Sequence, residues 1–555
     1  MSSTAVRRAA RRRSAFLTGV MFAASVAACA PSGGPSRSPS DAASLPTGNP
    51  APSIPAPTTA MSPAPSPPAT LDPASPEPLP TVAVATRVLH EGAVSPTPRA
   101  VGDRAWEPVL ATHPTDPDRV AVIYQHRGPG AACSLNPIIR ISHDGGRSWR
   151  STRAGPGARS GRGMGLHAAI AWGPGPSGGS RLYWANMTTP GCGDGRYSLT
   201  TAYSDNEGRT WSRLRVERRT RPWVGGFPEI AVDRDPRSPN HGTVYVAYNW
   251  LGQGARGPGF RLLASSDFGA TWRAAEIKPA ALAGGAKDWW RIAYRLRPAP
   301  DGSVYAAWYQ VDLRRWDRRN IFSKGGPGNV QRLGIGVARI RFDAVTGTIA
   351  VGTSRIATTV RETAWTTRSA SAPGTSGNIR PDPMWQYGFD VDPDGRPFLA
   401  VAGYGPARKG SARGTIRVGR SDDHGRTWSF VTLPPAPVRG GRQQSILRPN
   451  LVAGSGYILV TFRTLDDVSA GATMGIAYSL STDGGVHWTD AESVGNVRWR
   501  TSNLNGVVNG AGLRERAERT ADGDVVWAYG DGRLAKGRAA GRTAIFAARI
   551  DVDIH

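Results

Sequence analysis

The side chains that could do chemistry in this 555-residue sequence are arginines, carboxylates and aromatic rings at the ends of predicted strands. A guanidinium group binds a carboxylate through two parallel N–H donors. The expected anion-binding residues are Arg127, Arg291, Arg448 and Arg463, beside the rings of Trp290 and Trp385. Cleavage of a glycosidic bond would also need a carboxylic acid to protonate the bridging oxygen. The expected acids are Glu229, Asp312 and Asp382, and the expected nucleophiles are Tyr387 and Tyr404.

Other catalytic and metal-binding motifs are absent from the sequence. It has no GxSxG, P-loop, HExxH or paired CxxC motif, and its nine histidines are scattered without the spacing of metal ligands. We therefore expect neither a metal nor another cofactor. The formal net charge of +26 favours anionic partners such as acidic glycans or a membrane surface. Nucleic acid is not expected, because no recognition helix, RNP motif or zinc spacing is present.

Residues 1–29 are predicted to be an export signal. A basic stretch from Arg7 to Arg13 precedes an apolar run from Ala15 to Ala24, which is too short for a stable membrane span. The run leads to Val26-Ala-Ala-Cys29, which resembles the bacterial lipobox, whose cysteine is lipidated after cleavage. The resemblance implies an anchor at Cys29 on the outer face of the cytoplasmic membrane, and an ordinary signal peptide is the alternative. The route of export stays open, because Arg11–Leu17 also resembles a twin-arginine signal.

Residues 30–80 are predicted to be a disordered tether. They are rich in proline, serine and alanine and contain no aromatic residue, so they cannot bury enough apolar surface to offset the entropy lost on ordering. A proline-rich chain is extended by about 3.1 Å per residue, so such a tether could carry a domain into a cell wall. The folded domain is expected over residues 81–555.

Five segments of that domain repeat one pattern. In each, Asp or Asn stands two positions after a serine, glycine four positions after it and tryptophan seven positions after it. The segments are 142–149, 204–211, 265–272, 421–428 and 481–488. The pattern suits a tight hairpin, because the Asp or Asn oxygen accepts turn amides and glycine supplies a positive φ. The residues predicted to have this structural role are Asp144, Asn206, Asp267, Asp423 and Asp483. We refer to the five segments as the box turns.

A second repeat is a strand of aromatic and β-branched residues. Its seven copies begin at Val120, Leu182, Val244, Val304, Phe398, Ile458 and Val525. They predict an all-β propeller of seven four-stranded blades, with six blades as the alternative. The 94-residue interval after Val304 predicts an enlarged fourth blade, with insertions around 312–336 and 354–378. The isolated segment Thr86–His90 is expected to pair into the last blade and close the ring.

Strand direction sorts the candidate residues onto one end of the propeller. Because neighbouring strands are antiparallel, the first strands start and the second strands end at the same face, whereas the box turns lie at the other. The arginines, carboxylic acids, tyrosines and tryptophans proposed above are expected on the face opposite the box turns. Trp106, Glu107, His167 and Arg514, among others, are expected on the same face.

Two cysteines remain if Cys29 carries lipid. Cys133 and Cys192 follow the second strands of adjacent blades, so their loops share a face. In an oxidising compartment this placement predicts a disulfide between them.

The repeats resemble the Asp-box (BNR) propellers of the sialidase superfamily over about residues 85–555. The resemblance implies a functional pocket opposite the box turns. Sialidases hold the substrate carboxylate with three arginines and use a tyrosine nucleophile, assisted by a glutamate, and an aspartate acid/base; their first arginine lies in an R-I-P motif. Here the matching stretch Arg104–Val109 has Trp106 at that place, whereas Tyr124–Arg127 resembles the arginine-bearing end of the next strand.

Three functional hypotheses stay open. The first is a monomeric, non-catalytic surface propeller that binds glycan, a cell-wall component or a protein partner. The second is a sialidase-like glycoside hydrolase acting on an acidic sugar, and the absent R-I-P motif favours the first over it. The third is an assembly factor that meets a membrane complex through basic patches.

Overall fold

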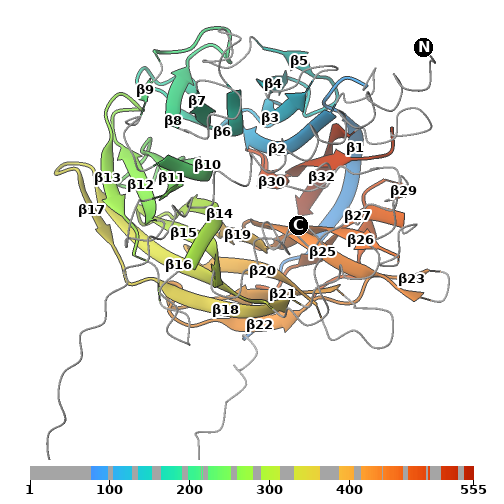
Figure 1. The fold of residues 1–555 in the computed structure, drawn as a ribbon. Helices are drawn as coiled ribbons and strands as arrows, with labels where there is room; N and C mark the ends of the chain where they lie inside the picture. The colour runs from blue at the N-terminus through green and yellow to red at the C-terminus, as the bar shows by residue number, and fades with distance from the viewer. Residues whose placement is uncertain are drawn as a thin grey trace, which may run out of the picture.

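The computed structural model is an all-β propeller of seven antiparallel blades around a central axis (Figure 1). It describes residues 77–97, 104–127, 136–152, 164–189, 198–213, 215–216, 223–251, 259–278, 280, 289–312, 331–362, 387–404, 414–439, 442–466, 473–495, 498–500, 514–534 and 543–555. None of these residues is helical, so they include no helix that could cross a membrane. The prediction of seven blades is confirmed.

Several candidate residues lie outside this description. The export signal with Cys29, most of the tether, both Cys133 and Cys192, and also Asp382 and Trp385 are outside the described residues. For Arg127, Trp290, Arg291, Asp312 and Tyr404 the structure describes the backbone only. Their predicted roles therefore stay predictions.

The first three blades follow the chain from the innermost strand outward. Blade 1 comprises β2 (Arg104–Thr112), β3 (Val120–Arg127), β4 (Asn136–Ser142) and β5 (Arg150–Ser151). Blade 2 comprises β6 (Met164–Pro174), β7 (Ser180–Thr189), β8 (Ser198–Ser204) and β9 (Arg215–Val216). Blade 3 comprises β10 (Trp223–Val232), β11 (Val244–Leu251), β12 (Gly259–Ser265) and β13 (Arg273–Glu276).

The next three blades carry additions to this plan. Blade 4 comprises β14 (Trp289–Pro298), β15 (Ser303–Asp312), β16 (Gln331–Asp343) and β17 (Thr348–Val351), and β18 (Arg355–Glu362) also pairs with β16. Blade 5 comprises β19 (Tyr387–Val391), β20 (Pro397–Tyr404), β21 (Gly414–Arg420) and β22 (Ser429–Thr432). Blade 6 comprises β25 (Ser445–Ala453), β26 (Ile458–Leu465), β27 (Thr473–Ser481) and β28 (Glu492–Ser493), with β29 (Trp499–Arg500) on β27 and the ribbon β23 (Val438–Arg439) and β24 (Arg442–Gln443) before it. Part of the insertion predicted at 354–378 is thus the extra strand β18.

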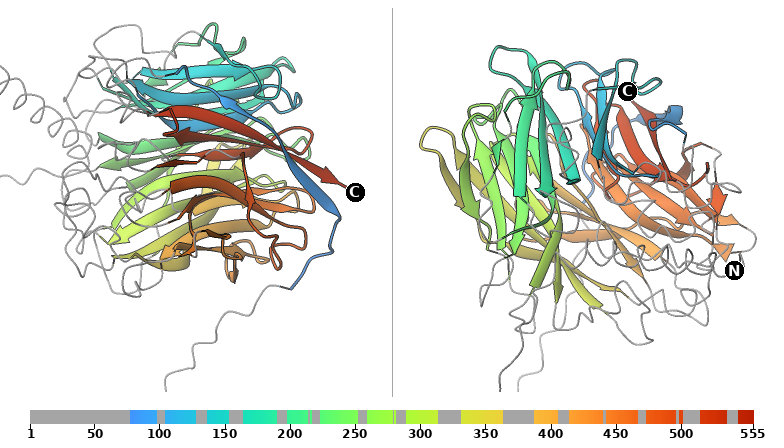
Figure 2. Two further views of the ribbon diagram at one scale, coloured as in Figure 1. Left: turned by 90° about the vertical axis from the view of Figure 1, so that its right-hand side faces the viewer. Right: turned by 45° about the horizontal axis from the view of Figure 1, so that its top comes forward.

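Blade 7 is closed by the N-terminal strand. It comprises β30 (Arg516–Arg519), β31 (Val525–Asp531), β32 (Ala544–Ile554) and β1 (Val84–Ala93), and β1 pairs with β32 from Val84↔Ile554 to Ala93↔Phe546. Figure 2 shows the two strands side by side at the edge of the molecule. The pairing covers an edge of β32 that would otherwise offer unpaired backbone groups. The predicted closure is confirmed.

Apolar side chains on both faces of each sheet hold neighbouring blades together. Between blades 1 and 2, for example, Val109 and Ile123 lie in one buried cluster with Ile170 and Trp184. The second strand of a blade is covered on both faces, which explains its nearly unbroken apolar sequence.

The box turns are held by their own side chains. In the first, the Ser142 hydroxyl donates to Asp144 Oδ1 and accepts the Gly146 amide at 2.7 Å, while Asp144 Oδ1 accepts the Ser148 amide at 2.8 Å. The same three contacts recur in the other four turns. Gly146 has a φ of 102°, in the left-handed region that favours glycine. The Asp or Asn side chain of each box turn thus stabilises the hairpin, which is the role that its position in the sequence pattern predicts.

Candidate functional site

The strand register separates the two ends of the axis. In blade 1, Arg104 pairs with Arg127 at one end, whereas Thr112 and Ser142 both pair with Val120 at the other, where the box turn begins. The starts of first strands and the ends of second strands therefore share the face opposite the box turns. The sequence placed the candidate residues on this face.

A bulge on the innermost strand of several blades shapes this end of the axis. Five residues other than glycine have positive φ at equivalent places in blades 1, 2, 3, 6 and 7: Glu107 (55°), His167 (54°), Phe227 (31°), Arg448 (55°) and Arg514 (58°). In β2, β6, β10 and β25 the strand register shifts at this residue. A bulge leaves one residue outside the ladder and re-aims its side chain. We call these five residues the bulge ring.

Proline follows the bulge residue in three of the blades. Pro108, Pro228 and Pro449 stand directly after the bulge residues of blades 1, 3 and 6. Proline has no N–H to give to the ladder, so within sheets it is confined to edges and bulges. A left-handed backbone costs a residue other than glycine about 1–2 kcal/mol. Strain of this kind is often kept at functional sites.

One side of the bulge ring holds a carboxylate–imidazole pair. The Nδ1 atom of His167 lies 2.7 Å from Glu107 Oε2, and the imidazole also lies against the Phe227 ring, with centroids 3.8 Å apart. The Glu107 side chain is 3% exposed and that of His167 is 19% exposed. A carboxylate on one ring nitrogen fixes the orientation of an imidazole, which can then take up or release a proton.

Arg514 of blade 7 reaches across the axis toward blades 2 and 3. Its guanidinium donates to the carbonyls of Ala168 at 3.1 Å and Pro228 at 2.7 Å, in blades 2 and 3, and lies 3.9 Å from Glu229. Burial lowers the pKa of Arg514 to about 10, against the opposing effect of the Glu229 and Glu107 carboxylates. Arg514 is therefore still a cation at neutral pH.

Between the bulge ring and the box-turn face, further ion pairs cross the axis. Arg516 of blade 7 pairs with Glu229 of blade 3, and both side chains are almost fully buried. Nearer the box turns, Arg297 of blade 4 pairs with Asp390 of blade 5 at 2.7 Å and with Glu518 of blade 7 at 3.0 Å. The centre of the propeller is thus packed with charged side chains, and β30 and the residues just before it supply several of them.

The structure brings only some of the predicted residues to this site. Arg448 belongs to the bulge ring, and Glu229 lies just below it between Arg514 and Arg516. Arg463 is fully buried, with its guanidinium bonded to Glu515 and to the Gly530 carbonyl. It therefore fixes blade 6 to blade 7, which corrects its assignment as a ligand-binding residue.

Two of the proposed catalytic groups are placed in unsuitable surroundings. The Tyr387 hydroxyl donates to the Ala307 carbonyl at 3.0 Å within a buried apolar cluster, and burial raises the pKa of Tyr387 well above its usual value. Such a hydroxyl does not suit a nucleophile. Glu229 is almost fully buried between the guanidinium groups of Arg514 and Arg516, so its carboxyl group is not exposed to a substrate. Neither residue is carried into the proposal below as a catalytic group.

Sequence reasoning put Glu107, His167 and Arg514 on the correct face but did not select them. Two signals could have singled them out. A residue before proline, as in Glu107-Pro108, marks a bulge when it falls inside a predicted inner strand. The run from Arg514 to Arg519 is also charged at five of six positions, where other inner strands are mostly apolar.

No protein-family model and no curated protein sequence matches the chain. Among solved structures it is similar to the α-L-arabinanase of Penicillium chrysogenum, with a TM-score of 0.40 and 12% identity over 73% of this chain and 98% of that one. A PL25 ulvan lyase gives a TM-score of 0.39 with 13% identity, over 78% and 93% of the two chains. The phage phi92 endosialidase gives 0.41 with 11% identity, over 84% and 69%. The propeller assignment itself rests on the strand pairing described above.

Among the described residues no group of three or more His, Cys, Asp or Glu side chains is arranged to hold a metal ion. The bulge ring itself offers the Arg448 and Arg514 side chains and the carboxylate–imidazole pair of Glu107 and His167.

Proposed function

We propose that the protein is a cell-surface propeller that binds an acidic sugar of a glycan at the bulge ring. The observation that carries the proposal is the placement of Arg448 and His167 in the bulge ring at one end of the axis, at strained backbone positions. Guanidinium groups suit a sugar carboxylate, because their planar N–H donors match its two oxygens. Phe227, also in the ring, supplies an apolar face beside these polar groups.

A second candidate function is cleavage of a glycosidic bond at the same place. The specific observation in its favour is the 2.7 Å contact between His167 and Glu107, because an oriented imidazole can act as a general acid or base. In this reading His167 transfers the proton to or from the reacting oxygen, and Glu107 orients the imidazole.

The orientation that we propose for the propeller on the cell is compatible with the same site. We propose that residues 1–29 direct export, that Cys29 carries lipid and that residues 30–76 form a tether. The chain leading into β1 lies on the box-turn face, since the Leu79 amide donates to the Asp483 carbonyl at 2.9 Å and Arg420 donates to the Glu77 carbonyl at 2.7 Å. A tether that leaves from this face would turn the bulge ring away from the membrane.

The test is binding to an array of acidic and neutral glycans, with turnover of a fluorogenic sialoside measured in parallel. We expect the wild-type protein to bind acidic glycans, Arg448→Ala to lose this binding and Arg448→Lys to keep part of it. The matched control is Arg87→Ala, which removes an equal charge from the exposed outer strand β1. Turnover that is lost in His167→Ala supports the second candidate. If the wild-type protein neither binds nor turns over any acidic glycan, both functions are ruled out.

The lipid anchor is tested by membrane fractionation and intact mass. Wild-type protein should remain with membranes and carry acyl groups, whereas Cys29→Ala should be released. Membrane retention of Cys29→Ala, with no acyl mass on the parent, would contradict the anchor without affecting the glycan proposal.

A further inference from the structure

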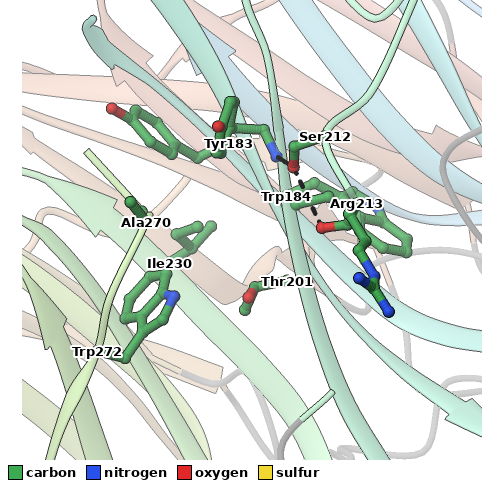
Figure 3. A pocket seen from close by; sticks show the side chains of 11 residues that line it. Tyr183, Trp184, Thr201, Ser212, Arg213, Ile230, Ala270 and Trp272 are labelled. Carbon is green, nitrogen blue, oxygen red and sulfur yellow. Dashed lines mark hydrogen bonds between the residues drawn. The ribbon is translucent and has the colours of Figure 1, made fainter. Parts of the chain in front are cut away.

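A pocket of about 430 Å³ lies between blades 2 and 3. It is lined by Tyr183, Trp184, Thr201, Ala202, Tyr203, Ser212, Arg213, Ile230, Gly269, Ala270 and Trp272. Figure 3 shows Ile230, Ala270 and Trp272 on one side of the space and Arg213 on the other. Because Tyr203 precedes one box turn and Trp272 ends the next, the pocket belongs to the box-turn end of the propeller. We call it the lateral pocket.

Two local features of the sequence open this space. In blades 1, 3 and 5 the outer strand begins directly after the box-turn tryptophan, at Arg150, Arg273 and Ser429. In blade 2 the outer strand begins only at Arg215, so Ser212 and Arg213 form an irregular segment that borders the pocket.

The second feature is the small side chain of Ala270. The same position of three other box turns carries Arg147, Arg209 and Arg426. A long side chain is therefore compatible with the turn, and alanine leaves the space beside Trp272 unfilled. Gly269 adds to the opening, because its Cα faces the rings of Tyr183 and Tyr203 without a side chain between them.

The lining combines aromatic rings with a cation. Tyr203 and Trp272 are half-buried, and the guanidinium of Arg181 lies 3.7 Å from the Tyr203 ring centroid, which fixes that ring. The buried indole N–H of Trp272 has no hydrogen-bond partner among the described residues. Arg213 is exposed, and within the described part of the chain its guanidinium makes neither a hydrogen bond nor an ion pair. A ligand could thus meet ring faces and a guanidinium in one place.

We infer that the lateral pocket binds a single sugar ring that carries a carboxylate, as a second site independent of the bulge ring. Its volume is within the range of small-ligand pockets, about 300–1,000 Å³. The rings of Tyr203 and Trp272 face the apolar side of the sugar, and Arg213 binds the carboxylate through two N–H donors. An apolar peptide side chain would leave the Arg213 guanidinium without a partner, so an anionic ligand fits the lining better.

The test is a ligand-detected NMR titration of the folded domain with methyl glucuronide and, as the neutral match, methyl glucoside. The wild-type protein is expected to bind the glucuronide about tenfold more tightly, because one charge-assisted contact distinguishes the two. Arg213→Ala should remove this preference. Ala270→Trp should abolish binding of both, because the indole fills the pocket at a position where other box turns carry arginine. Arg209→Ala, an exposed arginine of the adjacent box turn outside the lining, should bind as the wild type does.

The outcomes separate this site from the bulge ring. Glucuronide binding that is kept in Arg448→Ala and lost in Ala270→Trp supports the lateral pocket. This result does not depend on whether the bulge ring binds a glycan. Loss in Arg448→Ala with retention in Ala270→Trp assigns the ligand to the bulge ring and overturns the inference. The inference is also overturned if the wild type binds neither sugar, or if it binds both equally and Arg213→Ala has no effect.

Discussion

The imidazole of His167 and the carboxylate of Glu107 form a 2.7 Å contact across the boundary between blades 1 and 2, and both residues have a left-handed backbone. The bulges bring together two side chains that are sixty residues apart in sequence. Each residue has a φ near 55°, which a glycine would adopt without strain. Glu107 and His167 thus occupy positions at which glycine would have less backbone strain.

This relationship gives a first prediction about stability. His167→Gly and His167→Ala both remove the imidazole, but only glycine relieves the left-handed backbone, so the glycine variant should be more stable than the alanine variant by roughly 1 kcal/mol. Urea denaturation followed by tryptophan fluorescence gives the difference. An alanine variant as stable as the glycine variant would show that position 167 is not strained.

The buried pair of Arg463 and Glu515 gives a second prediction. Arg463→Met leaves the Glu515 carboxylate buried without its cation, and the free energy of unfolding should fall by about 3–5 kcal/mol. The double variant Arg463→Met with Glu515→Leu should recover part of this loss, since it leaves no unpaired charge. As a control, Arg87→Met breaks a pair whose arginine is 76% exposed, and it should cost less than about 1 kcal/mol. Equal costs for Arg463→Met and Arg87→Met would contradict the prediction.

The box turns give a prediction about pH. Partial burial opposes the charged form, but hydrogen bonds from Ser148 and Thr427 prevail and lower the pKa of Asp144 and of Asp423 to about 2, from a usual value of 3.8. A lowered folded-state pKa adds stability above the unfolded value, and this stability is lost as the pH falls from about 4 to about 2.

Asparagine variants test this titration. Asn206 occupies the same position in blade 2, where its Oδ1 accepts the Thr210 amide at 2.8 Å, so the turn tolerates an amide. The double variant of Asp144→Asn and Asp423→Asn should therefore fold, and its stability should depend less steeply on pH between about 4 and 2. Thermal denaturation across this range measures the slope, and an unchanged slope would contradict the assignment.

Closure of the ring gives a fourth prediction. A chain that begins at Val94 lacks β1 and exposes the edge of β32, so it should unfold at a lower temperature and self-associate. A chain that begins at Glu77 keeps β1 and serves as the control. Thermal denaturation and size-exclusion chromatography compare the two. If both chains are monomeric and equally stable, β1 is not needed for closure.

The fifth prediction concerns the two remaining cysteines. In the sequence Cys133 falls between β3 and β4 and Cys192 falls between β7 and β8, and the facing ends of these strands lie opposite the box turns in adjacent blades. A disulfide between them would add on the order of 4 kcal/mol in the loop-entropy model. Counting free thiols in the denatured, non-reduced mature protein decides the matter: we expect none, and two would exclude the bond.

The sequence alone determined the repeating parts of this protein. A box turn is held by contacts within eight residues, such as those from Ser142 to Trp149, so its pattern can be read without knowledge of the rest of the chain. The apolar second strands are equally local signals, and their number predicts the number of blades. Strand alternation then places Glu107, His167 and Arg514 on the face opposite the box turns.

Only the tertiary structure decided which charged groups meet at the axis. Arg516 and Glu229 are 287 residues apart, and no local pattern links them. Their pairing depends on how far the ring turns between blade 3 and blade 7 and on where each inner strand bulges. Arg463 illustrates the consequence, because its place at a strand end suggested a ligand-binding role, whereas Glu515 of the next blade occupies its guanidinium. A buried charge must be paired, and the closed ring determines which partner is within reach.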